Sequence, residues 1–486
     1  MSGFTLADLV RENARSYPLR EAVACSGERL TFAEFDARVN GLAAVLGDAK
    51  VRRGDRVLWL AQNCHRALEM LFACAKLGAV FVPANWRQAA EEMAFVIEDS
   101  QPRLAVWQEA EIGQRVAAAR AVAGRDTAWL RIDELGTRAD EEPAEDIDED
   151  AVIVQMYTAA FEGRPRGAQL SHRNLVTSSL QHAFTQRYGW DDVHLASMPF
   201  FHVLGLLNAV AIFHVGALNV VVRRSDPEEI SRLISAERVT RAILIGPTVG
   251  DVIRAAEHHR HDLSSLRTIP GGGGADAERW SQMTTPDLPP MGGYGQTELA
   301  GQVTYDAYGP RGEGSHGHAA PLAVVRIVGE EGDELSPGEA GEIVVRGPQI
   351  MRGYAGVASV GEWRHTGDLG RREADGSITF IGPKTELIKT GAENVYPAEV
   401  EAALARHPAV KESCVFGVSD PVWRKAVKAV VVLRDGESLD APTLIDFCKE
   451  HIASYKKPRD IQFVTQLPRA ASGTIDRDEV KRLYGG

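Results

Sequence analysis

The chain has 486 residues, of which 44% are hydrophobic and 25% are charged, a composition typical of a folded globular protein and not of a disordered or collagen-like one. A single hydrophobic core is not expected at this length, so we predict at least two domains. The 54 basic and 67 acidic residues give a net charge of −13, which argues against nucleic acid or an anionic membrane as a partner held by bulk charge.

The N-terminal segment, MSGFTLADLVRENARSYP, lacks the basic region and apolar core of a signal peptide. No apolar run in the sequence is long enough to span a bilayer. The five cysteines are scattered and include no CxxC pair, so they predict neither a disulfide framework nor a zinc site. We therefore expect a soluble, cytoplasmic protein.

The first part of the chain alternates helix and strand patterns. Thr31 to Glu34 (TFAE) form a capping box, which predicts the start of an amphipathic helix. Residues 54–60 (GDRVLWL) predict a buried strand, residues 64–79 a helix that Gly78 closes, and the following AVFVPAN another strand. Such alternation indicates α/β layers with largely parallel sheets.

Residues 138–150 (RADEEPAEDIDED) form an acidic stretch with few core residues. Runs of like charge are usually solvated, so we favour a loop here over a metal-binding site.

The pattern changes after residue 341. Short strands with glycines at both ends, at 341–347 and 376–382, indicate a small β unit. A helix with proline in its first turn is predicted over 397–410, and two strands, a helix over 441–452 and a last strand complete an α+β module. We therefore predict an α/β fold with a large N-terminal domain, residues 1–384, that includes the small β unit, and a small α+β domain, residues 385–486.

Residues 152–175 (VIVQMYTAAFEGRPRGAQLSHRNL) are the most informative segment. A strand pattern leads into a loop with Gly163, Gly167 and basic residues, and a helix led by Ser171 follows. Strand–loop–helix arrangements of this kind present backbone N–H groups to phosphate. Taken alone, the segment is explained equally well by a surface turn.

Six further motifs follow in order: PFFHVLG (199–205), GGGGAD (271–276), YGQTE (294–298), HTGD (365–368), ELIKTGAENVYPAEVE (386–401) and YKKPRDIQFVTQLPRAASG (455–473). Together with residues 152–175, this set resembles the adenylate-forming superfamily of acyl- and aryl-CoA synthetases, peptide-synthetase adenylation domains and firefly luciferase. The resemblance covers essentially the whole chain. It implies that the large domain holds ATP and a carboxylate, and that a mobile small domain swings about a hinge at Thr385 between two poses.

The resemblance also implies a nucleotide site. In that site Tyr294 stacks on adenine, Thr297 contacts phosphate, Glu298 ligates Mg²⁺ and Asp368 accepts hydrogen bonds from both ribose hydroxyls. A carboxylate oxygen suits a hard cation that screens the triphosphate. For Glu298 or Asp368 taken singly, a structural salt bridge is the usual alternative. The other nucleotide-binding residues that the resemblance implies are Thr158, Arg164, Arg166, Gly272, Gly273, Gly274, Gly295 and Gln296.

His202 is implied to lie beside the acyl pocket and the CoA tunnel, and it joins Thr297 and Glu298 as a catalytic candidate. A packed core histidine is nearly as good an explanation of His202. Apolar residues around it favour a fatty or aromatic acid as the substrate. The other implied residues of the pocket and tunnel are Val203, Gly246, Gly391 and Ala392.

The sequence departs from this family at the ATP phosphates. The family's phosphate loop is rich in Ser, Thr and Gly and ends in Lys, whereas residues 158–167 read TAAFEGRPRG, with Glu162 facing the expected triphosphate. The family's arginine just before the ELIK segment is Pro383 here. Its near-terminal lysine, which clamps the substrate carboxylate and the α-phosphate during adenylation, is Thr474. Removing one such donor typically costs a factor on the order of 10²–10³ in rate.

We therefore predict an AMP-forming carboxylic acid–CoA ligase that uses ATP, Mg²⁺ and coenzyme A. The acid and ATP give an acyl-adenylate and pyrophosphate, and the CoA thiol then displaces AMP. The alternative is a divergent homologue with weak adenylation that binds nucleotide or acyl-CoA, or that uses a non-CoA acceptor. An amino-acid adenylation domain fits less well, because the PFFHVLG region lacks the aspartate that holds a substrate amine. The expected partners are these small molecules, not nucleic acid, and a homodimer is left open.

Overall fold

The computed structural model describes residues 3–88, 90–123, 127–136, 142–143, 146–158, 165–244, 247–268, 275–288, 292–308, 314–358, 361–384, 388–390, 393–395, 397–421, 424–452, 454, 456–470 and 474–485. By its internal contacts the chain forms two compact units. The first unit is Met1–Val325 with Val345–Arg364, and the second is Arg326–Val344 with His365–Gly486.

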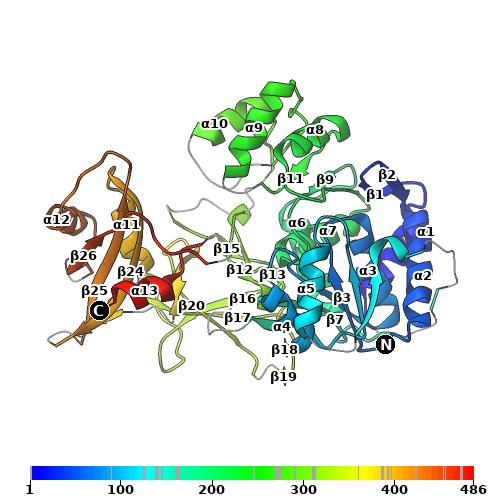
Figure 1. The fold of residues 1–486 in the computed structure, drawn as a ribbon, viewed down its shortest axis with the longest axis horizontal. Helices are drawn as coiled ribbons and strands as arrows, with labels where there is room; N and C mark the ends of the chain where they lie inside the picture. Colours follow the sequence, from blue (N-terminus) through cyan, green and yellow to red (C-terminus); the bar gives the residue numbers. More distant parts are fainter. Residues whose placement is uncertain are drawn as a thin grey trace. The chain divides into compact units, whose positions relative to one another are not determined.

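The first unit contains an eight-stranded sheet in the order β19-β18-β8-β7-β4-β3-β5-β6. Figure 1 labels β3, β7, β18 and β19 of this sheet. Strands β7, β4, β3, β5 and β6 run parallel to one another, whereas the β7–β8, β8–β18 and β18–β19 pairs are antiparallel. The predicted, largely parallel sheet is therefore confirmed, with an antiparallel side added. Its strands are β3 (Arg56–Leu60), β4 (Val80–Pro83), β5 (Leu104–Trp107), β6 (Ala128–Arg131), β7 (Val152–Thr158), β8 (Arg166–Ser171), β18 (Gly353–Tyr354) and β19 (Val357–Ala358).

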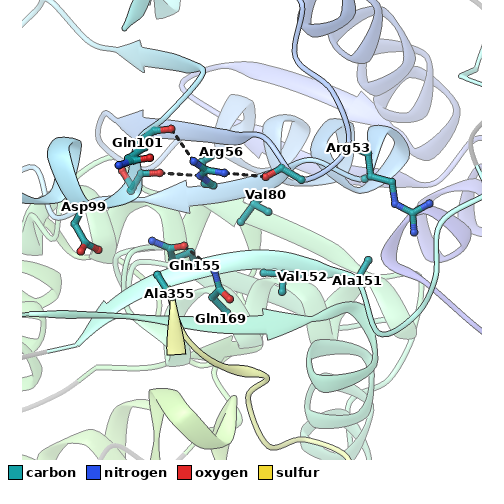
Figure 2. A pocket seen from close by; sticks show the side chains of 14 residues that line it. Arg53, Arg56, Val80, Asp99, Gln101, Ala151, Val152, Gln155, Gln169 and Ala355 are labelled. Carbon is teal, nitrogen blue, oxygen red and sulfur yellow. Dashed lines mark hydrogen bonds between the residues drawn. The ribbon is translucent and has the colours of Figure 1, made fainter. Parts of the chain in front are cut away.

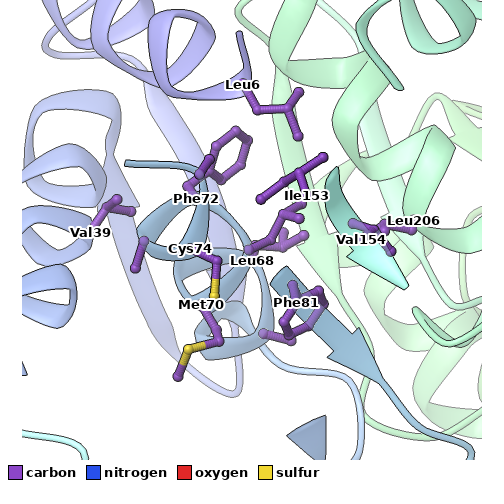
Figure 3. Packing of buried hydrophobic residues seen from close by; sticks show 14 of the residues in the cluster. Leu6, Val39, Leu68, Met70, Phe72, Cys74, Phe81, Ile153, Val154 and Leu206 are labelled. Atoms are coloured by element: carbon purple, nitrogen blue, oxygen red, sulfur yellow. The ribbon is translucent and has the colours of Figure 1, made fainter. Parts of the chain in front are cut away.

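Helices cover both faces of this sheet. Successive side chains of a strand point to opposite faces, and here apolar side chains lie on both. In β3, Val57 and Trp59 join one buried cluster, and Leu58 and Leu60 join another. Figure 3 shows the first cluster, in which Phe72 and Ile153 approach each other from a helix and a strand. The helices of these two layers are α1 (Leu6–Ser16), α2 (Phe32–Asp48), α3 (His65–Leu77), α4 (Ala90–Ser100), α5 (Gly113–Ala123), α6 (His172–Thr185) and α7 (Val203–His214).

A second sheet of the first unit has the order β11-β9-β10-β1-β2, with only the β1–β2 pair antiparallel. Helices α8 (Pro227–Glu237), α9 (Pro247–His259) and α10 (Ala275–Met283) pack on it around Trp280. Its strands are β1 (Glu21–Cys25), β2 (Glu28–Thr31), β9 (Val193–Ala196), β10 (Leu218–Val221) and β11 (Arg241–Ala242).

Local sequence signals set several element ends where they were predicted. The Thr31 side chain accepts from the Glu34 N–H, and the Glu34 carboxylate accepts from the Thr31 N–H, so the capping box starts α2. Gly78 ends α3 with φ of 67°, a left-handed conformation that suits glycine.

The second unit contains most of a four-stranded sheet in the order β16-β17-β20-β21 and a three-stranded sheet in the order β24-β25-β26. Helices α11 (Pro397–Ala405) and α12 (Ala441–His451) pack on one face of the second sheet, and α13 (Arg477–Tyr484) packs on the other. The strands are β16 (Val324–Val328), β17 (Ala340–Arg346), β20 (Arg364–Arg372), β21 (Ile378–Pro383), β22 (Ile388–Thr390), β23 (Glu393–Val395), β24 (Val410–Asp420), β25 (Arg424–Leu433) and β26 (Asp460–Phe463).

Two local expectations need correction. The helix predicted over 397–410 ends at Ala405, since Pro408 disfavours helical backbone at the residue before it. Within the acidic stretch, Glu142 is not solvated as expected, because it bonds to Arg11 Nη2 at 2.6 Å and to the buried Lys76 Nζ at 3.1 Å. These ion pairs attach Glu142 to α1 and α3.

The two units place residues 326–344 and 365–384 with the C-terminal segment, whereas the predicted division starts the small domain at residue 385. The predicted boundary concerns a pivot, and it stays a prediction. Within the part of the chain that the structure describes, no helix is both long and apolar enough to cross a bilayer.

Candidate active site

The YGQTE motif forms a tight hairpin in the first unit. Strand β12 (Gly295–Gln296) pairs antiparallel with β13 (Gly301–Gln302), and Thr297–Leu299 form a 3₁₀ turn between them. A Cβ on Gly295 would lie 2.2 Å from the Gly301 carbonyl oxygen, so this close pairing requires glycine. Tyr294, only 5% exposed, is fixed by its N–H, which donates to Thr304 Oγ1 at 2.8 Å.

Glu298, the predicted magnesium ligand, is held by a second motif. The Tyr354 hydroxyl donates to Glu298 Oε1 at 2.7 Å, and Arg364 Nη2 donates to the same hydroxyl at 3.0 Å. Burial, followed by the charge of Glu298, raises the pKa of Tyr354. The phenol therefore stays protonated and acts as the donor to the carboxylate.

Thr158 and Arg166 flank the altered phosphate loop. They are paired in register as the last residue of β7 and the first of β8, and Thr158 Oγ1 lies 3.5 Å from the Arg166 carbonyl oxygen. The Arg166 guanidinium carbon lies 4.8 Å from the centre of the Tyr354 ring. The structure thus brings Arg166 and Glu298 to the same tyrosine from distant parts of the sequence.

His202 is exposed and stands at the N-cap of α7, directly before Val203. Its pKa is lowered, first by desolvation and then by the charge of Arg87. The Phe201 ring centre is 4.6 Å from that of His202, and the Arg87 guanidinium carbon is 5.8 Å from the centre of the Phe201 ring. His202 is thus not a packed core residue.

Asp368, the predicted ribose carboxylate, lies in the second unit on β20 and is 8% exposed. Thr366 Oγ1 accepts from the Asp368 N–H at 3.1 Å. The neighbouring Gly367 N–H donates to Glu342 Oε1 at 3.1 Å, and Lys384 Nζ donates to Glu342 Oε2 at 2.7 Å. Burial alone would raise the pKa of Glu342, but the bonds from Lys384, His365 and the Gly367 N–H together lower it.

Thr474, at the position of the family's lysine, lies in the second unit in a short turn before α13. Its carbonyl oxygen accepts from the Ala470 N–H at 2.9 Å, and its side chain is exposed. Arg469 of the same turn is paired with Glu412 of β24. This cation is therefore already used by another carboxylate.

Several predicted site residues lie outside the described residues, and their roles stay predictions. They are Arg164, Gly246, Gly272, Gly273, Gly274, Thr385, Gly391 and Ala392.

A pocket of about 580 Å³ lies elsewhere in the first unit (Figure 2). Arg56 and Val80, the first residues of β3 and β4, line it, and so do Asp99, Gln155 and Gln169. It thus lies where these parallel strands begin, whereas ligands of open α/β sheets bind beyond their carboxyl ends. The Arg56 side chain donates to the Ser100 and Gln101 carbonyls at 2.8 and 3.1 Å, so it caps the end of α4.

Sequence reasoning missed Tyr354, Arg364 and Lys384 as neighbours of site residues. Tyr354 reaches Glu298 because β18 pairs with β8, a long-range contact that no local pattern reports. The one available signal was the tyrosine of RGY (352–354), which ends a strand pattern not far before HTGD.

The side chains around Glu298 suit magnesium better than a metal ion whose ligands all come from the protein. Among the described residues no group of three or more His, Cys, Asp or Glu side chains could form a metal site. Mg²⁺ commonly takes one or two carboxylates together with substrate phosphates. A single carboxylate, Glu298, bonded by a tyrosine and lying near arginines that can attract phosphate, fits that pattern.

Two family models match most of this chain, and several known relatives match nearly all of it. The model of the AMP-binding enzyme matches residues 10–355, and that of the AMP-binding enzyme C-terminal domain matches residues 399–474. Feruloyl-CoA synthase from Amycolatopsis sp is 37% identical to this chain, covering 97% of each chain. Indoleacetate–CoA ligase from Aromatoleum aromaticum is 32% identical, covering 98% of each.

A solved structure resembles the whole fold. The O-succinylbenzoate coenzyme A synthetase of Bacillus subtilis, solved in complex with ATP and magnesium ion, superposes with a TM-score of 0.83 at 28% identity. The match covers 97% of this chain and 99% of that one.

Proposed function

The chain belongs to the AMP-binding enzyme family, and we propose that it is an AMP-forming acid–CoA ligase for an aromatic carboxylic acid. The observation that carries this proposal is the YGQTE hairpin, in which Glu298 is presented by a turn and held by Tyr354. The relatives named above support the substrate class, since feruloyl and indoleacetate groups are aromatic.

Each predicted residue has a task in this reaction. Glu298 holds Mg²⁺, which when bound screens the triphosphate while the substrate carboxylate attacks the α-phosphorus. Tyr294 stacks on adenine, Thr297 contacts phosphate and Asp368 binds the ribose hydroxyls. The products of this first step are the acyl-adenylate and pyrophosphate. Splitting the reaction in this way converts a poor electrophile into a mixed anhydride.

The second step uses the CoA thiol. The thiol attacks the acyl carbon, the bond from that carbon to the phosphate oxygen breaks, and AMP leaves with the bonding electrons. We propose that His202, Val203, Gly246, Gly391 and Ala392 line the acyl pocket and the route of the thiol. The exposed side chain of His202 at the start of α7 is accessible to such ligands.

The two steps need different residues at one place, which favours a moving small domain. We propose that residues 385–486 pivot about Thr385 between the steps. A cytoplasmic location also belongs to this proposal, because the reaction needs ATP and coenzyme A together.

A second candidate function is weak adenylation with efficient handling of a preformed acyl-adenylate. Thr474 favours it, since a threonine cannot place a positive charge between the carboxylate and the α-phosphate. A non-CoA acceptor is included in this alternative.

The test is a substrate panel. The protein is incubated with ATP, Mg²⁺, CoA and ferulate, indoleacetate, 2-succinylbenzoate or a fatty acid of matched carbon number. Pyrophosphate release and acyl-CoA are then measured. We expect acyl-CoA and equimolar pyrophosphate with at least one aromatic acid. Release of neither product with any acid would contradict the proposed function.

A further inference from the structure

Four side chains of the first unit form what we call the tyrosine cluster: Arg166, Glu298, Tyr354 and Arg364. The Tyr354 hydroxyl donates to Glu298 Oε1 at 2.7 Å and accepts from Arg364 Nη2 at 3.0 Å. The guanidinium carbons of Arg166 and Arg364 lie 4.8 and 5.4 Å from the centre of the Tyr354 ring. One tyrosine thus contacts a carboxylate and two cations.

The backbone fixes these contacts. Tyr354 of β18 pairs with Ala168 of β8, two residues after Arg166. The Met351 N–H donates to the Glu298 carbonyl oxygen at 3.0 Å, which ties the same segment to the 3₁₀ turn of the YGQTE hairpin. The segment around residues 351–354 therefore joins the strand that follows the phosphate loop to the turn that carries the metal ligand.

The Tyr354 hydroxyl accepts a hydrogen bond from a cation and donates one to an anion. The phenol proton points at the carboxylate, because an ionised carboxylate can only accept a hydrogen bond. The oxygen lone pair accepts from Arg364. Hydrogen bonds in which one partner is ionised are the strong ones, and cations also bind the face of an aromatic ring.

We propose that Tyr354 is a positioning residue of the phosphate site, resting on the ATP- and Mg²⁺-dependent function proposed above. Its hydroxyl fixes Glu298 Oε1 and so orients the carboxylate that would hold Mg²⁺. Its ring contacts the guanidinium groups of Arg166 and Arg364, and these two cations supply positive charge for the phosphates of ATP.

The first test is Tyr354→Phe, which keeps the ring and removes the hydroxyl. ATP binding is followed by displacement of a fluorescent ATP analogue while Mg²⁺ is titrated. In a second titration Mn²⁺ replaces Mg²⁺, and free Mn²⁺ is read by electron paramagnetic resonance. Loss of a partner that orients a metal ligand typically costs 10–100-fold in metal affinity, so we expect the half-saturating metal concentration to rise by about that factor. Binding of AMP without metal should not change.

Tyr157→Phe is the matched control. Tyr157 lies on β7 and its hydroxyl also donates to a carboxylate, Asp99 Oδ2, at 2.6 Å, but it has no contact with Glu298 among those the structure describes. The same chemical deletion at this position should leave the metal titration unchanged. An equal shift in both variants would show that loss of any phenol in this sheet weakens the site, and it would overturn the proposal.

A double-mutant cycle tests whether Tyr354 acts through Glu298. Glu298→Gln alone should raise the half-saturating metal concentration, and adding Tyr354→Phe should change it by less than twofold, because residues that share one interaction are not additive. If the effects of the two substitutions on the half-saturating metal concentration were fully additive, Tyr354 would act independently of Glu298. That result would overturn the positioning role.

The two arginines are tested separately. Arg166→Gln and Arg364→Gln should each raise the Kd of ATP about tenfold at saturating Mg²⁺ and leave that of AMP unchanged, since AMP lacks the β- and γ-phosphates. Should Tyr354→Phe fail to fold, Arg364→Gln still tests the positioning role of Tyr354. This substitution removes the donor to the Tyr354 oxygen and should raise the half-saturating metal concentration at least threefold.

The outcomes separate this inference from the proposed function. A wild-type protein that binds no ATP with metal would contradict the proposed function itself. A wild-type protein that binds ATP with metal, together with a folded Tyr354→Phe variant that shows the wild-type metal titration, would overturn the positioning role alone.

Discussion

Asp368 and Pro383 stand directly opposite each other on the antiparallel strands β20 and β21. Opposite residues in such a pair put their side chains on the same face of the sheet. Proline is tolerated here because β21 is the edge strand of its sheet. The family's arginine, expected at residue 383, would therefore lie beside Asp368, the predicted ribose carboxylate. In this chain the nearby cation, Lys384, is bonded to Glu342 instead.

Pro383→Arg should restore that cation. An arginine beside Asp368 adds a charge-assisted contact near the ribose and α-phosphate, so we expect the Kd of AMP to fall by about three- to tenfold. The measurement is isothermal titration calorimetry with AMP. In an Asp368→Asn background, Pro383→Arg should lower the Kd of AMP by a smaller factor. An unchanged Kd of AMP in Pro383→Arg alone would show that the nucleotide does not contact residue 383.

Glu298→Gln should reduce adenylate formation by at least about 100-fold while leaving the melting temperature nearly unchanged. The substitution removes a metal ligand and its charge, not buried packing. Pyrophosphate release at several Mg²⁺ concentrations is the readout. Glu237→Gln, which breaks the partly exposed pair between Glu237 and Arg29, is the control and should retain full activity. Activity of Glu298→Gln within twofold of wild type would place the metal elsewhere.

The sequence was sufficient wherever the signal was local or carried by a motif. The capping box at Thr31 and the left-handed Gly78 set helix ends as predicted, and the alternation of elements predicted the parallel sheet. It was insufficient where distant segments meet. The bond from Tyr354 to Glu298 and the anchoring of Glu142 by Lys76 depend on tertiary packing, which no short window of sequence contains.

Acid should destabilise the first unit through buried histidines. Burial lowers the pKa of His182 and of His194 to about 4, from 6.5 in an exposed histidine. Because the folded-state pKa is depressed, the unfolded chain binds more protons between pH 6.5 and pH 4. Stability present above pH 6.5 is therefore lost as the pH falls through that window.

The check is the free energy of unfolding, obtained from urea titrations between pH 7 and pH 4. Each such histidine contributes at most about 1.4 kcal/mol per pH unit to the slope of that free energy against pH. His182→Gln should therefore reduce the slope by up to that amount. His258→Gln, a substitution of a histidine exposed at the end of α9, is the control and should leave the slope unchanged. An identical slope in His182→Gln would show that folding does not lower the pKa of His182.

Thr474→Lys should accelerate the first half-reaction and not the second. The Thr474 side chain is exposed, so a lysine fits without repacking. One well-placed cationic donor can supply a factor of about 10², and the altered phosphate loop will reduce the gain. Single-turnover formation of the acyl-adenylate is the readout. Arg469→Ala is the companion variant, and because Arg469 is paired with Glu412 it should cost little. A large loss in Arg469→Ala would identify Arg469 as the substitute cation.

The most direct test of the account compares the two half-reactions in the wild-type protein by rapid-quench kinetics. One reaction starts from CoA and the synthetic adenylate of the aromatic acid that gives most acyl-CoA in the substrate panel, and the other from that acid, ATP, Mg²⁺ and CoA. We expect acyl-CoA in both, formed about 100-fold faster from the adenylate, because Thr474 handicaps only the first step. Absence of any acyl-CoA from the adenylate would contradict the ligase function, and equal rates from the two starting points would contradict the handicap at Thr474.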